Sequence, residues 1–269
     1  MLKASVIISF YNRIDYLRFV LAGFERQTFR NFEIIIADDG SKNEVVREIE
    51  TLSERISFPL IHLWHEDKGF RKNKILNRAI TAAASDYLLF IDGDCVPHRN
   101  FVEEHLNAAF EKICFTGRRV NLSEKFTKKL NKDKVRNGYL ENSLHLMVVD
   151  GLFGKSDYVE RGFYVENKFL RHFLNKKKRG LLGCNFSLFK KDVLEINGFD
   201  ERYQFPSIGE DSDVQYRLEL NNVNIKSLNN IAVQYHLYHK LQERTRENLD
   251  LFAKIKESGL SYTPFGIIK

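Results

Sequence analysis

Four short apolar runs, separated by segments with helical spacing, constrain the fold of this chain more than any other feature. The runs occupy residues 6–8, 33–37, 60–64 and 87–91. The run 87–91 is typical of a strand buried on both faces of a parallel sheet, and the other three are interpreted as further strands. Between them, apolar residues recur at intervals of three and four, as on the buried side of a helix. The alternation predicts an α/β fold with a mostly parallel central sheet, right-handed crossovers and flanking helices.

Polar residues gather where these strands end. They occupy residues 9–13, 38–41, 67–71 and 92–94. In open parallel sheets ligands bind at the carboxyl ends of the strands, so we expect these segments to share a binding site. The segment Asp92-Gly93-Asp94 offers two hard oxygen ligands, which suit Mg²⁺ or Mn²⁺ carrying a diphosphate. A pair of aspartates that only caps a loop is the structural alternative.

Length, charge and cysteine content narrow the class of protein. The chain has 269 residues, enough for one large domain or one domain with an insertion. Its formal charge of +6 is compatible with polyanionic ligands or an anionic lipid surface. The sparse, odd set of Cys95, Cys114 and Cys184 contains no metal-binding pair and indicates a reducing compartment. Because the sequence shows no signal peptide and no membrane-spanning run, we expect a cytoplasmic protein with at most peripheral contact at the inner membrane face.

Beyond Phe101 the periodicity weakens and then returns. Residues 121–180 are polar and aromatic, and we interpret them as an insertion of helices and loops. The basic run 176–179 is typical of a solvated surface, with a lipid or polyanion contact as the alternative. Regular patterns resume in three segments: a strand and helix over 183–198, a helix opened by 209–213, and a strand over 231–239.

Five segments together resemble one protein family. They are residues 9–13, 38–41, 67–77, 92–94 and 209–211. As a set they resemble the inverting family 2 glycosyltransferases of the GT-A fold. The C-terminal half, from 183–185 through 210–211 to His236, is similar to catalytic regions of the chondroitin polymerase and β4-galactosyltransferase type. The resemblance covers residues 4–120 and 180–240.

The resemblance implies one GT-A domain in two halves, with an acceptor-side insertion. Residues 1–120 would bind the nucleotide sugar, residues 121–240 would bind the acceptor and carry the catalytic groups, and residues 241–269 would form a helical tail. The implied reaction moves a hexose or N-acetylhexosamine, with inversion and a metal ion, from a UDP-sugar to a sugar hydroxyl. The acceptor would be a glycan such as a polysaccharide or lipopolysaccharide, free or lipid-linked. No nucleic acid partner is expected.

Binding of the nucleotide sugar is assigned to the N-terminal strand ends. A base needs a planar neighbour and an acceptor for its imide N–H; Tyr11 could stack on it and Asp39 could accept that bond, which would select uracil. Either Asp38 or Asp39 could instead serve the turn. By resemblance, further contacts come from Ser9, Arg13, Arg71, Asp92, Gly93 and Asn185. A buried tyrosine and a surface arginine are the structural alternatives for Tyr11 and Arg71.

The metal ligands are assigned by the same resemblance. Asp92 would contact the ribose or the metal, and Asp94 would ligate it. A further ligand would come from His236 or His239, of which His236 is favoured. A mixed oxygen and nitrogen ligand set suits Mn²⁺, with Mg²⁺ as the alternative.

An inverting transfer also needs one base, because it is a single in-line displacement at the anomeric carbon. Asp211 occupies the position of the family's base. Glu210 would hold hydroxyl groups of the sugar or the acceptor. Both open a predicted helix, where acidic residues are also common as caps.

Two other functions remain alternatives at this point. A nucleotidyltransferase acting on sugar phosphates also needs a sheet and acidic metal ligands, but it would carry a glycine-rich basic loop where residues 9–13 stand. A non-enzymatic polyanion-binding module would explain the positive charge and residues 176–179, but not the acidic strand ends, which repel phosphate. A dehydrogenase is excluded because no G-x-G-x-x-G follows the first strand.

Overall fold

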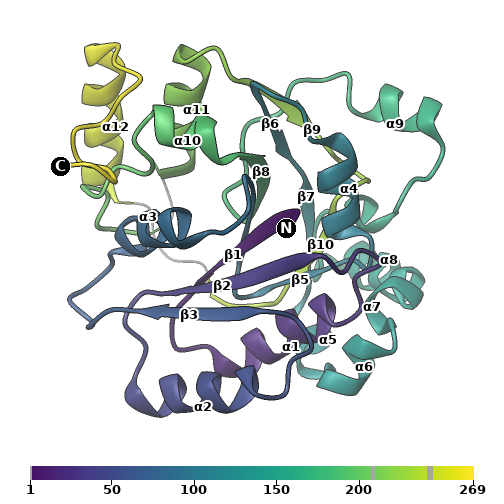
Figure 1. Cartoon of the computed structure of the whole chain (residues 1–269). Helices are drawn as coiled ribbons and strands as arrows, with labels where there is room; N and C mark the ends of the chain where they lie inside the picture. Colours follow the sequence, from purple (N-terminus) through teal and green to yellow (C-terminus); the bar gives the residue numbers. More distant parts are fainter. Residues whose placement is uncertain (1, 207–209, 241–244) are drawn as a thin grey trace.

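A seven-stranded sheet forms the centre of the chain in the computed structural model, which describes residues 2–206, 210–240 and 245–269 (Figure 1). Its order is β3-β2-β1-β4-β8-β6-β9. The bounds are β1 (Ala4–Phe10), β2 (Phe32–Asp38), β3 (Leu60–Trp64), β4 (Tyr87–Asp92), β6 (Ile113–Thr116), β8 (Asn185–Phe189) and β9 (Asn224–Ser227). Only β8 is antiparallel to its neighbours, β4 and β6. The predicted α/β class with a mostly parallel sheet is therefore confirmed.

A second, three-stranded sheet was not predicted. It consists of β5 (Cys95–Pro97), β10 (Val233–His236) and β7 (Arg118–Asn121), with β10 in the middle. His236 pairs with Cys95, and the Leu237 amide donates to the Asp94 carbonyl at 2.8 Å. The outer strands are too short to show a period of two, so only β10 was visible as a strand in the sequence. This sheet carries His236 to the end of β4.

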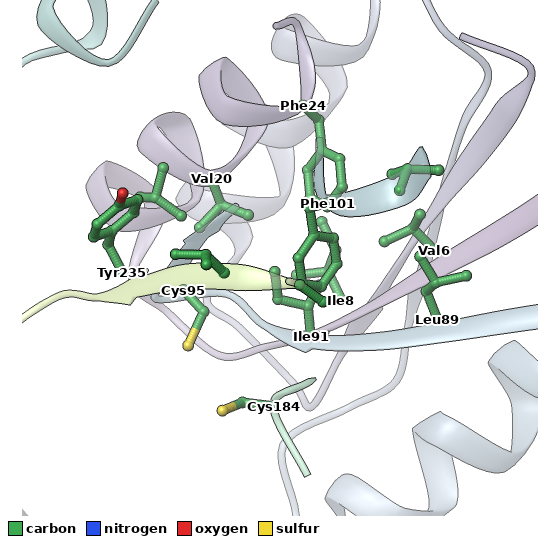
Figure 2. Close-up of a cluster of buried hydrophobic side chains, with 14 of the residues drawn as sticks. Val6, Ile8, Val20, Phe24, Leu89, Ile91, Cys95, Phe101, Cys184 and Tyr235 are labelled. Carbon is green, nitrogen blue, oxygen red and sulfur yellow. The ribbon is translucent and has the colours of Figure 1, made fainter. Parts of the chain in front are cut away.

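Helices cover both faces of the large sheet because successive strand residues point to opposite sides. The first face, with Val6 and Ile8, is covered by α1 (Ile14–Phe24), α2 (Asn43–Ser53) and α4 (Phe101–Ala108). Figure 2 shows part of this core, including Val20 and Phe24 of α1 against the sheet. The second face, with Ile7, is covered by α3 (Lys72–Ala82), α10 (Lys190–Glu195) and α11 (Glu210–Leu220).

The segment between β7 and β8 folds as helices and loops, as expected for the insertion. Its elements are α5 (Glu124–Lys128), α6 (Lys132–Arg136), α7 (Tyr139–Asn142), α8 (Leu144–Leu152), the 3₁₀ helix η1 (Val159–Gly162) and α9 (Lys168–Leu174). Arg26, which follows α1, donates to both oxygens of Glu141 in α7 at 2.8 and 2.7 Å. This ion pair attaches the segment to the rest of the domain. No helix within the described residues combines the length and apolarity needed to cross a bilayer.

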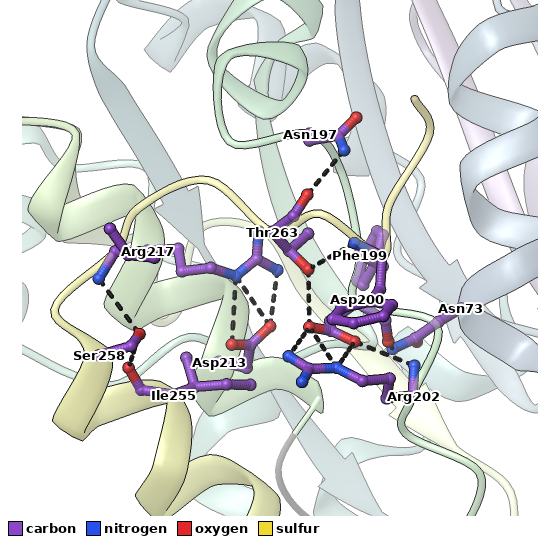
Figure 3. Close-up of polar contacts among 12 residues, drawn as sticks. Asn73, Asn197, Phe199, Asp200, Arg202, Asp213, Arg217, Ile255, Ser258 and Thr263 are labelled. Carbon is purple, nitrogen blue, oxygen red and sulfur yellow. Dashed lines mark hydrogen bonds and ion pairs between the residues drawn. The ribbon is translucent and has the colours of Figure 1, made fainter. Parts of the chain in front are cut away.

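A buried polar network fixes α11 against the rest of the domain (Figure 3). Arg217 pairs with Asp213 at 2.6 Å and donates to the carbonyls of Ile196 and Gly198 at 2.8 and 2.9 Å. Beside it, Asp200 binds Arg202 and Thr263, which precedes the C-terminus and follows α12 (Arg246–Ser258). Because these charges are paired and hydrogen-bonded, they hold the first turn of α11 at the edge of the sheet.

Candidate active site at the carboxyl edge of the sheet

One cavity of about 530 Å³ opens where β1, β2 and β4 end, within the range usual for small-molecule sites. It is lined by Ser9, Phe10, Tyr11, Arg13, Asp39, Asp67, Gly69, Phe70, Lys72, Asp92, Gly93, Asp94, Pro206, His239 and Lys240. A small adjoining pocket shares Ser9 and Lys72 with it and reaches Glu210 and Asp211. The polar segments predicted to meet at this edge therefore do share one cleft.

The end of β4 is held against the end of β1. Ser9 and Asp92 are opposite each other in the parallel register, and the Ser9 hydroxyl donates to Asp92 Oδ1 at 2.5 Å. The Gly93 amide donates to the Ser9 carbonyl at 2.8 Å. A Cβ at Gly93 would lie 3.0 Å from Phe10 Cδ2 and 3.1 Å from Ser9 O, which explains why glycine separates the two aspartates.

Asp94, His236 and His239 form a cluster with metal-ligand chemistry. Asp94 Oδ2 lies 3.6 Å from His236 Nε2 and 3.1 Å from His239 Nε2, and the two Nε2 atoms are 3.1 Å apart. Donor atoms that share one ion at about 2.1 Å in octahedral geometry lie roughly 3 Å apart, so these residues fit a divalent cation. Both histidines, not one of the two, face the carboxylate.

The electrostatics of the cluster favour a charged carboxylate. Burial alone would raise the pKa of Asp94, but hydrogen bonds with His236 and His239 hold it well below its ordinary value. The hydrogen bond with Asp94 in turn raises the pKa of His239. Cys95, whose thiol lies 3.4 Å from Asp94 Oδ1, is a weaker candidate ligand because burial raises its pKa and keeps it protonated.

Asp38 stabilises the turn after β2, whereas Asp39 faces the cavity. Asp38 is fully buried; its Oδ1 accepts from the Ser41 amide at 2.8 Å and so serves the turn. Asp39 lines the cavity, and its oxygens accept from His65 at 2.7 Å and from the Arg71 amide at 2.9 Å. Burial raises the pKa of Asp39.

Tyr11 and Arg13 lie at the cavity mouth, whereas the Arg71 side chain turns away. Tyr11 is 49% exposed, which rules out a buried tyrosine, and its hydroxyl donates to Asp67 at 3.0 Å. The Arg71 guanidinium binds the Glu66 carbonyl and is not among the described cavity-lining residues. Direct contact between Arg71 and a ligand would require its side chain to change rotamer.

Lys72 links three of the predicted carboxylates. Its ammonium lies 2.9 Å from Glu210 Oε1 and 3.4 Å from Asp92 Oδ1. Burial opposes the charge, but Asp92, Glu210 and Asp211 hold the pKa of Lys72 well above its ordinary value. Within the described residues, the buried Oε2 of Glu210 has no hydrogen-bond partner and can accept one from a ligand.

Asp211 sits beside this group on the first turn of α11. Its Oδ2 accepts from the Gly183 amide at 2.8 Å. Burial, with Glu210 nearby, raises the pKa of Asp211 to about 6. A side chain at Gly183 would overlap this carboxylate and push it out of its present position. Gly209, which precedes the pair in the predicted motif, lies outside the described residues.

Asn185 does not belong to the cavity, contrary to the expectation that it binds the nucleotide sugar. It is fully buried in β8. Its amide donates to the carbonyls of Arg118 and Ala232 at 3.1 and 2.9 Å, and its oxygen bonds His105 at 3.1 Å. With every polar atom of its side chain used inside the protein, Asn185 joins β8 to the second sheet.

Lys72 and Gly183 were not singled out from the sequence as individual site residues. Lys72 opens α3 directly after the polar segment 67–71, at the same sheet edge, so its position in the sequence was a usable signal. The close approach at Gly183 had no such signal, because it depends on a carboxylate 28 residues away.

The fold is that of the GT-A glycosyltransferases, as comparison with known proteins shows. A family model described as glycosyl transferase family 2 matches residues 5–195, and one described as the N-terminal domain of galactosyltransferase matches residues 168–240. The chain belongs to glycosyl transferase family 2 and is a glycosyltransferase enzyme. Because the chain belongs to this family, the nucleotidyltransferase and the non-enzymatic polyanion-binding module are no longer alternatives.

Individual relatives are similar over most of this chain. Chondroitin synthase of Escherichia coli is 27% identical over 247 residues, which cover 86% of this chain and 34% of the relative. The chain thus spans about a third of the length of that relative. TarS 1-349 of S. aureus in complex with UDP-GlcNAc matches with a TM-score of 0.57 at 15% identity, over 96% of this chain and 65% of the other. GalNAc-T7 with UDP, GalNAc and Mn²⁺ matches with a TM-score of 0.63 at 14% identity, over 96% of this chain and 48% of the other. Both structures share the fold.

Proposed function

We propose that this enzyme transfers a hexose or N-acetylhexosamine from a UDP-sugar to a sugar hydroxyl of a glycan, with inversion and with a divalent cation. One observation carries the proposal: Asp94 and His239 of the cation cluster line the cavity, and Glu210 and Asp211 line the small pocket that adjoins it. A cation-binding group and a group that accepts a proton are the two parts such a transfer needs.

The nucleotide would lie against the ends of β1 and β2. The exposed ring of Tyr11 offers a stacking face for a base, and Asp39, which lines the same cavity, offers carboxylate oxygens to its imide N–H. Ser9 and Gly93 bring β1 and β4 close enough for Asp92 to face the same space. Arg13, at the cavity mouth, supplies positive charge for the diphosphate.

Asp94, His236 and His239 would hold the cation, Mn²⁺ or Mg²⁺. When bound there, the cation neutralises charge on the diphosphate and so assists departure of UDP. The protein's own contribution is to keep Asp94 ionised and both imidazoles turned toward it.

Asp211 would act as the base. As the acceptor oxygen bonds to the anomeric carbon and the bond to the diphosphate breaks, the hydroxyl proton passes to Asp211. A pKa raised to about 6 suits this task, because the carboxylate is ionised at neutral pH yet basic enough to take a proton. Glu210 Oε2 is free to orient a hydroxyl, while Lys72 holds Oε1.

The sugar specificity follows the relatives. Structures with UDP-GlcNAc and with UDP and GalNAc support an N-acetylhexosamine or hexose donor, and chondroitin synthase supports a polysaccharide acceptor. We extend the acceptor class to lipopolysaccharide and related glycans, free or lipid-linked. We also propose a cytoplasmic location, and no role for nucleic acid.

The test measures UDP release from UDP-glucose, UDP-galactose and their N-acetylated forms, with Mn²⁺ or with chelator. We expect one donor to be turned over only with the cation, and Asp94→Ala to abolish turnover. Calorimetric titration with Mn²⁺ should give binding that Asp94→Ala and His239→Ala each weaken at least about 10-fold. His145→Ala, an exposed histidine of α8, is the matched control.

Two results would contradict the proposal. Turnover that is unchanged in Asp94→Ala would remove the cation assignment. Mn²⁺ binding weakened equally by His145→Ala and His239→Ala would show that the cluster is not the site.

A further inference from the structure

Helix α9 presents its apolar side to solvent. At helical spacing, Phe169, Leu170, Phe173 and Leu174 lie on one side, and they are 78%, 49%, 64% and 36% exposed. No residue of α9 is buried. A surface helix of a globular protein normally turns such a side toward the core.

The polar side of α9 is the one that contacts the body. Arg171 donates to both oxygens of Glu104 in α4 at 2.8 and 2.6 Å, to the Val165 carbonyl at 2.6 Å and to the Tyr164 hydroxyl at 3.0 Å. The Glu104 side chain is only 7% exposed. This partly buried bidentate pair fixes the rotation of α9 about its axis, so the exposure of the phenylalanines is set by specific contacts.

Basic residues follow the exposed apolar side chains. The exposed Lys176, Lys177 and Lys178 come directly after α9. Lys178 is paired with Glu219 at 3.0 Å, while the ammonium of Lys176 lies 5.7 Å from the Phe173 ring centre. Apolar anchors next to lysines match a bilayer surface, where rings enter the acyl boundary and ammonium groups meet anionic headgroups.

We propose that Phe169, Leu170, Phe173, Leu174, Lys176 and Lys177, here named the α9 surface, dock on an anionic phospholipid membrane. In Figure 1, α9 lies at the periphery of the molecule, and none of its residues lines the cavity described above. Docking through this surface therefore uses no cavity-lining residue. The proposal goes beyond glycosyl transfer and does not depend on it.

Charge argues for lipid over a second copy of this chain. A two-fold contact between two α9 surfaces would place the same lysines against each other, and the exposed Glu166 is the one acidic residue among 166–178. An anionic bilayer presents the opposite charge to every one of these lysines.

The experiment is co-sedimentation with vesicles of phosphatidylcholine alone and with about one-third phosphatidylglycerol. We expect the protein to bind the anionic vesicles at least about 10-fold more strongly than the neutral ones, and to be released by salt. The double variants Phe169→Ser/Phe173→Ser and Lys176→Glu/Lys177→Glu should each lose most of this binding. The control Phe110→Ser/Leu260→Ser removes two side chains that are 65% and 60% exposed elsewhere, and should bind as wild type.

Three results would overturn the proposal. The wild type could fail to bind anionic vesicles, or both α9 double variants could bind them as the wild type does. Alternatively, sedimentation velocity could show a dimer that only the α9 variants lose, which would assign the surface to a second copy. Circular dichroism melting of every variant separates lost binding from lost folding. UDP release in solution, which should be unchanged in the α9 variants, separates this test from that of the proposed function.

Discussion

The ammonium of Lys72, at the start of α3, lies 2.9 Å from a carboxylate oxygen of Glu210, at the start of α11. The two residues are 138 positions apart and come from the two halves of the chain. Their contact joins the strand ends around Asp92 to the helix that carries Asp211, so it couples the proposed nucleotide end of the cleft to the proposed base.

Replacing Lys72 by methionine should impair turnover by about 10- to 1,000-fold, since the variant leaves Glu210 buried beside other carboxylates without a counter-ion. Lys72 also lowers the pKa of Asp211, so its loss should move the acidic limb of the pH profile to higher pH. Lys72→Arg should restore part of the rate, and Lys74→Met, on the same helix and outside the cavity lining, should resemble wild type. An unshifted acidic limb in Lys72→Met would show that the ammonium does not act on the base.

Turnover should depend on the ionisation of Asp211. Because a base works only when deprotonated and its pKa is raised to about 6, kcat should fall as pH drops below 6 and level off above it. Asp211→Asn should lower kcat by about 10²- to 10⁴-fold and abolish that limb. The exposed Asp250→Asn serves as control. A near-normal kcat in Asp211→Asn would falsify the base assignment.

Gly183→Ala should reduce kcat without unfolding the protein. The added Cβ would overlap the Asp211 carboxylate, which must then leave its hydrogen bond with the Gly183 amide. We expect a loss of about 100-fold, comparable to misplacing a catalytic group by an ångström. Gly180→Ala is the matched control, since its Cβ would lie 3.4 Å from Gln215 Oε1, an ordinary contact. Equal rates for the two variants would mean that the position of Asp211 is adaptable.

Arg217→Met should destabilise the fold by about 3–5 kcal/mol, because it leaves Asp213 buried without its partner. Both side chains are only 1% exposed. Urea unfolding measures the change, and the double variant Arg217→Met/Asp213→Leu should recover most of it, since an apolar pair removes the stranded charge. If the double variant is no more stable than Arg217→Met, the loss comes from the carbonyls of Ile196 and Gly198 and not from Asp213.

Local pattern was sufficient for the N-terminal half of the fold. The runs that became β1, β2 and β4 are apolar because both faces of the parallel sheet are covered there, so they can be recognised from the sequence alone. The edge strand β3 is only partly buried. The same regularity predicts Ser9, Asp39, Asp92 and Asp94 at one sheet edge, because all parallel strands of the sheet end there, and these four residues do line one cavity.

Tertiary structure decided what depends on contacts between distant segments. The β5-β10-β7 sheet brings both His236 and His239 to Asp94, and no periodicity of three- and four-residue strands could have indicated this. The family resemblance predicts that Asn185 contacts the ligand. In the structure its side-chain amide instead donates both of its hydrogen bonds to backbone carbonyls of two other segments. The sequence determines the chemical type of each side chain. Which of its hydrogen-bonding atoms stay free, and which charged groups lie beside it, depend on contacts that form only in the folded protein.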